Sequence, residues 1–552
     1  MVDKRKHKDL IGFGVLLAVL LLVNVASQYK FFRLDLTSDK RYSISKGTIS
    51  AVEGLDKTLN VKVYLHGKFP AKFSKLEDAV KETLNEFKAY SANVEYDFID
   101  PNQASSDSLR GAQFQDIMRK GLQPISLKEN DGANSSELYV FPGAILEYGE
   151  RSIAINFIKG AEMSSPEERI SRSISELEYE FASAIKKLSQ DNKKRIALIE
   201  GHGEIAPNIM SDLLTELGES YDITVLNLAS VSKIQGIDAL IVAQPTQEYT
   251  EADKAKMDQF IVSGGKVMFC MDALEVRKDS IGMQALPYKL NLTDMFFNYG
   301  VRINENMVQD LTAAPVRVNT GSEYKLLPWS FHPLVSTFSD HVITKGFSGA
   351  AIYMRYINTL DTIKTQTAIR KTPLMFTSNY CKVKSQPVVY SAEELRIFLD
   401  KRYYPHSKLP VAYLLEGKFK SLYKGRALPQ GVEVDVKKDF GESAVVVVSD
   451  GDLLIPEVQE KTGRPYPLGF HPLLRQTFMN KTFVKNTLDY LLGENTISNL
   501  RAKQVDFRPL DKFRIQEEKL KWQIINIVIP ILLVILFGVF RYYLRKKKYA
   551  SF

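Results

Sequence analysis

The chain has 552 residues, of which 45% are hydrophobic and 25% charged, so it is long enough for about three to four domains of ordinary globular composition. Its formal net charge of +8 lies mostly at the two ends, since residues 1–9 carry +2 and residues 541–552 carry +5. The long middle is therefore nearly neutral. This argues against a nucleic-acid-binding protein, because such proteins carry a basic face on their folded part.

Two apolar runs adjoin the basic ends. Residues 10–27 and 522–540 contain no charged side chain, and each is about long enough to span a bilayer as a helix. Lys and Arg residues flank the outer end of each run, as is typical of cytoplasmic flanks. We therefore expect two transmembrane helices, with both tails (residues 1–9 and 541–552) in the cytoplasm and about 490 residues on the far side of the lipid bilayer.

Three amide side chains lie within these runs, Asn24 in the first and Gln523 and Asn526 in the second. Polar groups in membrane helices hydrogen-bond to neighbouring helices, so these residues are candidate contacts with a membrane partner. A cleaved secretory signal is the alternative for the first run, which has a basic start and the small residues Ala26 and Ser27 near its end.

Residues 28–190 are predicted to form an α/β domain followed by a connecting helix. Apolar periodicity predicts strands at 59–65 and 94–99 on either side of a helix at 73–90, and further elements at 108–119, 138–148 and 152–158. This order is thioredoxin-like, but the sequence lacks the Cys-x-x-Cys motif that redox chemistry of that fold needs. The apolar stripe of residues 166–188 fits packing on its own domain or binding of a partner helix.

A second α/β domain is expected to begin at residue 191. Short apolar strands at 196–199, 223–226, 239–243 and 266–271 alternate with helices, which predicts a parallel sheet of amidotransferase-like or flavodoxin-like type. Thr250 and Asp253 form a capping-box pattern that opens the last of these helices. We expect the first part of the domain at 191–276, an insertion subdomain at 277–410, its completion at 411–500 and a juxtamembrane segment at 501–521.

The best candidate for a ligand site is the turn Gly201-His202-Gly203-Glu204, which directly follows the first strand of this sheet. Open α/β sheets bind ligands beyond the carboxyl ends of their strands, so His202 and Glu204 are the candidate ligand-binding residues. A tight turn with solvated side chains is the alternative interpretation.

Catalytic, cofactor and metal sites are not predicted. The sequence contains no P-loop, so the chain is not itself an ATPase, and its seven histidines lack ligand spacing. Asp450 and Asp452 are interpreted as an Asp-Gly turn after a buried strand rather than as a cation loop. Cys270 and Cys381 give neither a disulfide framework nor a metal pattern, and whether they pair stays open.

Ordered motifs over nearly the whole chain resemble the GldG family, the gliding-motility ABC transporter auxiliary proteins of Bacteroidetes. These motifs are residues 34–37 (LDLT), 41–45 (RYSIS), 292–303 (LTDMFFNYGVRI), 414–421 (LLEGKFKS), 483–491 (FVKNTLDYL), 508–512 (RPLDK) and 522–526 (WQIIN).

The resemblance implies a non-enzymatic auxiliary subunit of an inner-membrane ABC-type complex, with substrate binding as one role and the bulk of the chain in the periplasm. Its implied partners are a multispanning permease and, through it, a cytoplasmic ATPase. The domain from residue 191 also resembles the glutamine-amidotransferase-like superfamily, without the cysteine nucleophile turn of its active members. A membrane-tethered periplasmic enzyme and a permease-independent scaffold are the alternatives.

Overall fold

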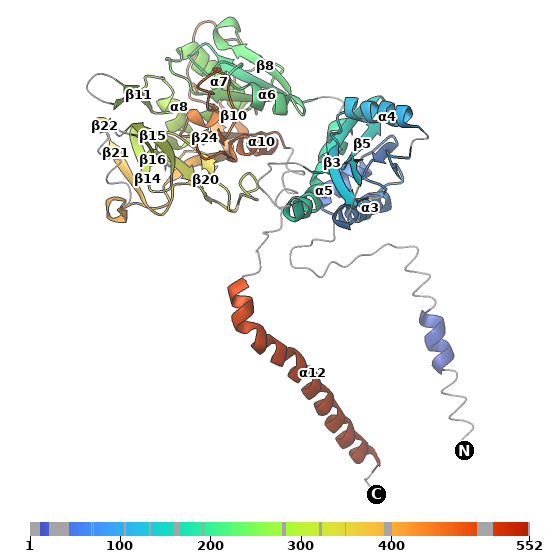
Figure 1. The fold of residues 1–552 in the computed structure, drawn as a ribbon. Coiled ribbons are helices and arrows are strands. Elements are labelled where there is room, and N and C mark those ends of the chain that lie inside the picture. The colour runs from blue at the N-terminus through green and yellow to red at the C-terminus, as the bar shows by residue number, and fades with distance from the viewer. Residues whose placement is uncertain are drawn as a thin grey trace. The chain divides into compact units, whose positions relative to one another are not determined.

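The computed structural model is a mixed α/β protein (Figure 1). It describes residues 12–20, 44–158, 166–189, 193–278, 283–319, 323–347, 349–390, 400–493 and 512–549, except residues 68, 70, 104, 105, 132 and 133. Its contacts divide the chain into residues 1–504 and residues 505–552. The first unit contains an N-terminal α/β region and a larger α/β region with separate hydrophobic cores.

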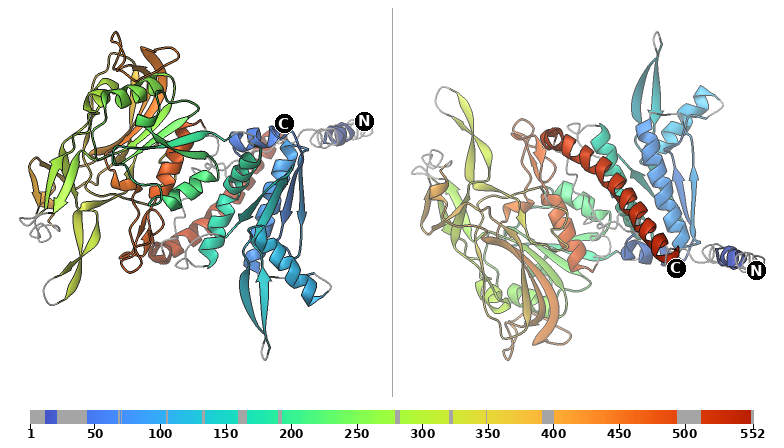
Figure 2. Two further views of the ribbon diagram at one scale, coloured as in Figure 1. Left: turned by 90° about the horizontal axis from the view of Figure 1, so that it is seen from above. Right: turned by 90° about the horizontal axis from the view of Figure 1, so that it is seen from below.

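The N-terminal region is built around a four-stranded sheet of order β2-β1-β5-β6, in which β1 runs parallel to β2 and antiparallel to β5. Its elements are α2 (Lys46–Glu53), β1 (Leu59–Val63), α3 (Ala71–Tyr90), β2 (Val94–Phe98), α4 (Asp107–Arg119), β3 (Ile125–Asp131), β4 (Asn134–Val140), β5 (Gly143–Tyr148), β6 (Arg151–Asn156) and α5 (Pro166–Ser189). Leu59, Val61 and Val63 of β1 are buried while the residues between them face outward, which is the alternation that predicts a strand. The hairpin β3–β4, which the sequence reading missed, extends from the sheet (Figure 2).

Helix α5 packs on its own region. Leu177, Phe181 and Ile185 are buried in the same core as the strands and α3, and the ring of Phe181 meets that of Phe87 edge to face at 6.0 Å. Of the two interpretations of the stripe at 166–188, the structure therefore supports packing within the domain, because the apolar face is already covered.

The larger region contains an eight-stranded sheet of order β17-β20-β23-β24-β10-β9-β7-β8. Its parallel part consists of β7 (Arg195–Glu200), β8 (Asp222–Asn227), β9 (Ala239–Ala243), β10 (Lys266–Cys270) and β24 (Phe440–Val448). In chain order these strands lie 2-1-3-4-5 across the sheet, the arrangement of one common group of doubly wound sheets. The apolar runs of β7, β9, β10 and β24 are buried on both faces, as parallel sheets require, whereas the edge strand β8 is only partly buried.

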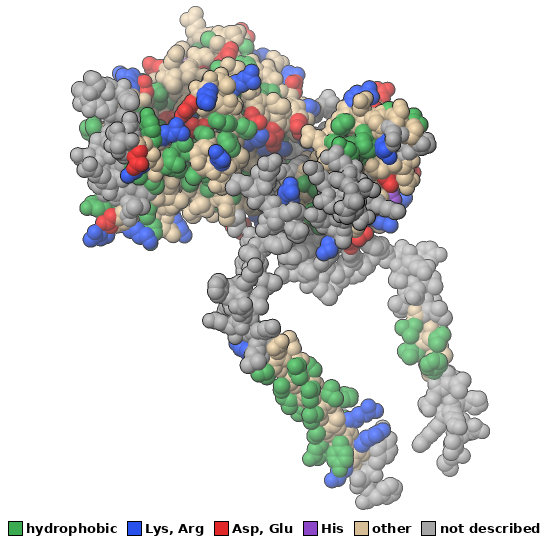
Figure 3. Space-filling model, in the orientation of Figure 1, with side chains coloured by type: hydrophobic (Ala, Val, Ile, Leu, Met, Phe, Trp, Pro, Cys, Tyr) green, Lys and Arg blue, Asp and Glu red, His purple; other side chains and the backbone are tan. Residues whose placement is uncertain are grey.

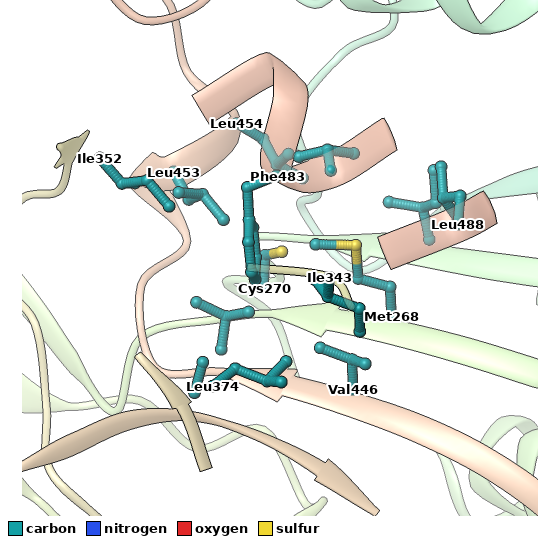
Figure 4. Close-up of a cluster of buried hydrophobic side chains, with 14 of the residues drawn as sticks. Met268, Cys270, Ile343, Ile352, Leu374, Val446, Leu453, Leu454, Phe483 and Leu488 are labelled. Atoms are coloured by element: carbon teal, nitrogen blue, oxygen red, sulfur yellow. The ribbon is translucent and has the colours of Figure 1, made fainter. Parts of the chain in front are cut away.

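Helices cover both faces of the parallel part. On one face Met268, Cys270 and Val446 meet α6 (Ser211–Gly218) and α10 (Asn480–Leu491), and Figure 4 shows Phe483 and Leu488 of α10 over these strands. The alternate strand residues point to the other face, which packs on α7 (Glu251–Val262) and α8 (Thr293–Tyr299). Thr250 caps α7 by accepting a hydrogen bond from the Asp253 backbone N–H at 3.1 Å, as the capping-box pattern predicts.

The segment between β10 and β24 contributes both to the main sheet and to several small sheets. It supplies the antiparallel strands β17 (Thr337–Phe338), β20 (Ile369–Phe376) and β23 (Pro410–Lys420), which extend the main sheet. It also folds into small sheets made from β11 (Leu274–Lys278), β12 (Met283–Pro287), β13 (Val301–Ile303), β14 (Asn306–Asp310), β15 (Ala313–Asn319), β16 (Tyr324–Val335), β18 (Ile352–Tyr353), β19 (Leu360–Thr362), β21 (Cys381–Ser385) and β22 (Val388–Tyr390). The short pair β25 (Phe470–His471) and β26 (Gln476–Thr477) follows β24. Cys270 and Cys381 are both buried and both free.

The second unit contains α12 (Lys512–Tyr549), whose segment Lys521–Lys547 is by length and composition able to cross a membrane. Figure 3 shows apolar side chains over most of this helix and Lys and Arg side chains toward its C-terminal end. The apolar helix indicates membrane association. Of the predicted first span, residues 12–20 are helical and exposed, and the remaining residues lie outside the described part of the chain.

Candidate functional site

The loops at the carboxyl edge of the parallel sheet bring together several buried charged side chains of the larger region. The loops after β7 and β9 meet at the topological switch point, where the strand order reverses and ligands of such sheets commonly bind. The loops after β10 and β24 lie side by side farther along the same edge, because these two strands are parallel neighbours. Two separate polar clusters form there, and we call them the histidine cluster and the acid cluster.

The histidine cluster consists of His202, Glu204, Tyr249, Asp253 and Lys256. The His202 Nε2 lies 3.3 Å from Asp253 Oδ2, and its Nδ1 lies 3.4 Å from Glu204 Oε1. The Tyr249 hydroxyl donates to Glu204 at 2.6 Å, and its ring stacks on the imidazole at 3.8 Å between centroids. Lys256 Nζ binds the other Asp253 oxygen at 2.9 Å. The fold thus brings the two predicted residues together and adds Tyr249, Asp253 and Lys256.

The histidine cluster is closed to solvent, since the side chains of His202, Glu204 and Asp253 are only 6%, 1% and 4% exposed. Burial favours a lower pKa for His202, but hydrogen bonds and charges from Glu204 and Asp253 outweigh it and raise the pKa. Burial likewise opposes ionisation of Glu204, whose pKa is nevertheless lowered by its bonds to His202 and Tyr249. Neither predicted residue is a solvated turn side chain. Together they form an ion-paired tether between the β7 loop and the start of α7.

Glycine is required in this turn. Gly203 has a φ of +75°, and a Cβ there would collide with the Thr246 hydroxyl. The backbone N–H groups of Thr246 and Gln247 both donate to the His202 carbonyl, at 2.9 and 2.8 Å, so the turn is held tightly against the loop after β9.

The acid cluster contains Asp272, which follows β10, and Asp450 and Asp452, which follow β24. The Gly451 N–H donates to Asp272 Oδ1 at 2.9 Å. The Gln244 amide, from the end of β9, donates to Asp272 Oδ2 at 3.0 Å and to Asp452 at 3.2 Å. The predicted Asp-Gly turn is present, but its aspartates face a third carboxyl that the sequence analysis missed.

Arg355 is the cation of the acid cluster. Its guanidinium contacts Asp452 at 3.3 Å and Glu457 at 3.4 Å, and its backbone N–H donates to Asp450 Oδ2 at 3.1 Å. Asp450 is fully buried, and its Oδ1 has no hydrogen-bond partner among the described residues. The cluster therefore sets one arginine side chain against four carboxyl groups.

This imbalance shifts the ionisation of the acids toward the protonated form. Burial, followed by repulsion from Asp452, raises the pKa of Asp272 to about 7. Burial and repulsion from Asp272 and Asp452 raise the pKa of Asp450 well above its ordinary value. Near neutral pH these two carboxyls therefore share fewer than two negative charges, and a nearby cation or proton donor would change that state.

A cavity of about 360 Å³ adjoins the acid cluster at Asp272. This volume is within the usual range for small-molecule sites. Its lining is Met271, Asp272, Ala273, Tyr288, Leu290, Leu292, Thr293, Phe296, Arg302, Ile303, Asn304 and Glu305. The charged side chains of the lining are Asp272, Glu305 and Arg302, the last of which is paired with Asp361 at 2.7 Å, and they lie beside apolar and aromatic surface.

Within the described part of the chain, no group of three or more His, Cys, Asp or Glu side chains is placed to hold a metal ion. The geometry of the acid cluster can bind a positively charged or hydrogen-bonding ligand and can exchange a proton with it.

The other predicted site residues lie in the two apolar runs, residues 10–27 and 522–540. Gln523 and Asn526 are exposed on α12 and, three residues apart, lie on one side of that helix. Asn24 lies outside the described residues.

The fold and the cavity define a doubly wound α/β protein whose ligand-sized cavity lies at the carboxyl edge of the sheet and whose C-terminal region carries an apolar helix long enough to cross a membrane. Residues 193–487 match the family described as "ABC-type uncharacterized transport system", whose short name denotes auxiliary components of ABC transporters. The match covers more than half of the chain, so the chain belongs to this family. Membership supports a non-enzymatic auxiliary role and association with transporter components. Residues 38–147 match a domain of unknown function.

An uncharacterized protein of Borreliella burgdorferi is 21% identical over 562 aligned residues, covering 99% of each chain. Among solved structures, the mmIFT52 N-terminal domain is 13% identical with a TM-score of 0.31 and covers 54% of this chain and 97% of that one. A thuA-like protein of Parabacteroides merdae is 10% identical with a TM-score of 0.26, covering 55% and 91%. Both scores are too low to support an inference.

Proposed function

We propose that the chain is an auxiliary, solute-binding subunit of an inner-membrane ABC-type transporter, with its large α/β regions in the periplasm. The observation that carries the proposal is the family match, because it covers the region that contains both the doubly wound sheet and the cavity. The motif resemblance narrows the complex to one associated with gliding motility. Its partners are a multispanning permease and, through that permease, a cytoplasmic ATPase.

The proposed topology has two membrane helices, residues 10–27 and 522–540, with both termini in the cytoplasm. The basic residues at the outer ends of both runs support this orientation. The helix α12 supports the second span, since it is exposed and apolar over Lys521–Lys547.

The proposed fold assignments follow from sheet order. The order β2-β1-β5-β6, with β1 and β2 parallel, supports a thioredoxin-like N-terminal domain. The 2-1-3-4-5 order supports a flavodoxin-like or amidotransferase-like second domain. Both are used here for binding and scaffolding. The chain lacks a P-loop, so it couples to ATP hydrolysis through contact with the permease.

The proposed contacts with the permease are Asn24, Gln523 and Asn526. Asn526→Leu removes a hydrogen-bonding group while keeping a similar volume, and such a contact is worth about 0.6–2 kcal/mol in membrane helices. Copurified permease should fall about threefold or more, while Val534→Leu on the same helix leaves it unchanged. Equal recovery of permease with Asn526→Leu would remove this residue from the interface.

The test of the proposed function is a mild-detergent affinity purification of the full chain, with the accompanying polypeptides identified by mass. A multispanning permease and an ATPase should be recovered together. Recovery of the chain alone from native membranes would favour the permease-independent scaffold.

A membrane-tethered enzyme is the second candidate, and the raised pKa values of Asp272 and Asp450 favour it, since paired acids of this kind are common in active sites. If it is correct, Asp272→Asn and Asp450→Asn each abolish turnover of a substrate that the purified chain converts without partners. Full function of both variants in transport would exclude it.

A further inference from the structure

We propose that the cavity beside Asp272 binds a small organic ammonium ion, which pairs with the Asp272 carboxylate and packs its apolar part against Phe296 and the neighbouring leucines. Only the biological role of this binding rests on the proposed solute-binding function. The site itself is argued from the charges and shape of the cavity.

The charges around the cavity favour a positively charged ligand. Among the described residues, neither Asp272 nor Asp450 has a Lys, Arg or His side chain within ion-pairing distance, and Asp450 Oδ1 is buried without a hydrogen-bond partner. The nearby arginines are already engaged, Arg355 by Asp452 and Glu457 and Arg302 by Asp361. A positively charged ligand would supply the missing counter-charge, because buried carboxylates require one.

Two observations argue for an organic cation over a metal ion. The described acidic residues are not arranged as metal ligands, and the cavity is far larger than a bare ion needs. At about 30 Å³ per water-sized group, a cavity of about 360 Å³ accommodates about a dozen non-hydrogen atoms. Its aromatic lining residues, Tyr288 and Phe296, suit an ammonium group attached to an apolar body.

Binding should be coupled to proton release. The titratable and charged groups around Asp272 are Asp450 and Asp452 from the loop after β24, Arg355, Tyr288 and Cys270, and Arg302 and Glu305 line the same cavity. Of these acids, Tyr288 and Cys270 have raised pKa values and stay neutral, so they do not compete for the cation. An ammonium ion stabilises ionised Asp272, whose pKa in the free protein is about 7. Affinity should therefore rise about tenfold from pH 6 to pH 8 and level off above that.

The experiment is calorimetric titration of the detergent-solubilised full chain with three amines, namely ethanolamine, putrescine and 2-phenylethylamine. 2-Phenylethanol and phenylacetate serve as neutral and anionic counterparts of the third amine. At least one amine should bind below about 10 mM, with at least tenfold preference over both counterparts. Failure of all three amines to bind, or equal binding of 2-phenylethanol, overturns the proposal.

Two variants test whether the amine binds in the cavity beside Asp272. Asp272→Asn should weaken amine binding at least tenfold and abolish its pH dependence, whereas the exposed Asp435→Asn should change neither. Should Asp272→Asn unfold, Thr293→Trp decides the matter, because Thr293 is exposed at the cavity and a bulky ring there should block entry without disturbing the core. Unchanged amine binding in Thr293→Trp overturns the proposal. Copurification of the permease is a separate readout, so amine binding without a permease would contradict the transporter role alone.

Discussion

The two polar clusters at the carboxyl edge of one sheet differ in charge balance. In the histidine cluster, His202 and Lys256 lie against Glu204 and Asp253, and every carboxylate has a cation within 3.4 Å. In the acid cluster, the Arg355 guanidinium pairs with two of the four carboxyl groups, Asp452 and Glu457, and a cavity adjoins a third, Asp272. Buried charge that is balanced holds loops together, whereas unbalanced charge next to a cavity is available for a ligand.

The largest effect expected from this comparison is at Arg355. Arg355→Met removes the only cation from the acid cluster and leaves buried carboxyls unpaired, so unfolding free energy should fall by about 3–5 kcal/mol at pH 8. Urea unfolding of the detergent-solubilised chain, followed through the fluorescence of buried Trp329, measures it. A change below about 1 kcal/mol would show that the acids are already neutral.

The next effect is at His202. His202→Gln keeps a polar side chain but removes the charge between Glu204 and Asp253, which should cost about 2–4 kcal/mol near pH 6. Because none of its residues lines the cavity at Asp272, amine binding there should be unaffected. If the His202→Gln protein folds normally but loses amine binding, the two clusters form one site.

The histidine cluster should also give a pH-dependent stability. The folded pKa of His202 is raised above its ordinary 6.5, so its contribution is fully present below pH 6.5 and is lost as pH rises through the folded pKa. Wild-type protein should therefore lose stability in that window relative to His202→Gln. Parallel curves for the two proteins between pH 6 and pH 9 would contradict the ion-paired tether.

The smallest effect has the opposite sign. Asp450→Asn keeps the acceptor for the Arg355 N–H but cannot ionise, so at pH 8 it should stabilise the fold by about 1 kcal/mol. The gain should disappear at pH 4, where Asp450 is protonated in the wild type as well. Destabilisation at pH 8 would indicate that the charge on Asp450 is compensated in the folded protein.

The local structure could be predicted from the sequence because apolar periodicity and the helix-capping pattern are both clear. Apolar periodicity located β7, β9, β10 and the capped start of α7, and it placed His202 and Glu204 at the carboxyl edge. Apolar periodicity could not show which residues that lie far apart along the chain contact one another in the fold. Asp253 lies 51 residues from His202, and Gly451 lies 179 residues from Asp272.

The antiparallel strands β17 and β20 were missed as parts of the main sheet for the same reason. Their pairing with distant segments is set by the completed fold rather than by neighbouring residues. The position of Asp272 could have been recognised from the sequence, since this residue follows the apolar run 267–271 much as Asp450 follows the apolar run 444–448. Two acids placed after adjacent parallel strands meet at one edge, once the strand order is known.

The most direct test of the distinction between a structural cluster and a ligand site is the number of protons released on amine binding. It is obtained by titrating 2-phenylethylamine into the full chain at pH 6.5 in two buffers of different ionisation enthalpy. With an Asp272 pKa of about 7, roughly three quarters of a proton should be released per bound amine, and none in Asp272→Asn. Binding of the amine without proton release would show that Asp272 is not its partner and would contradict the account.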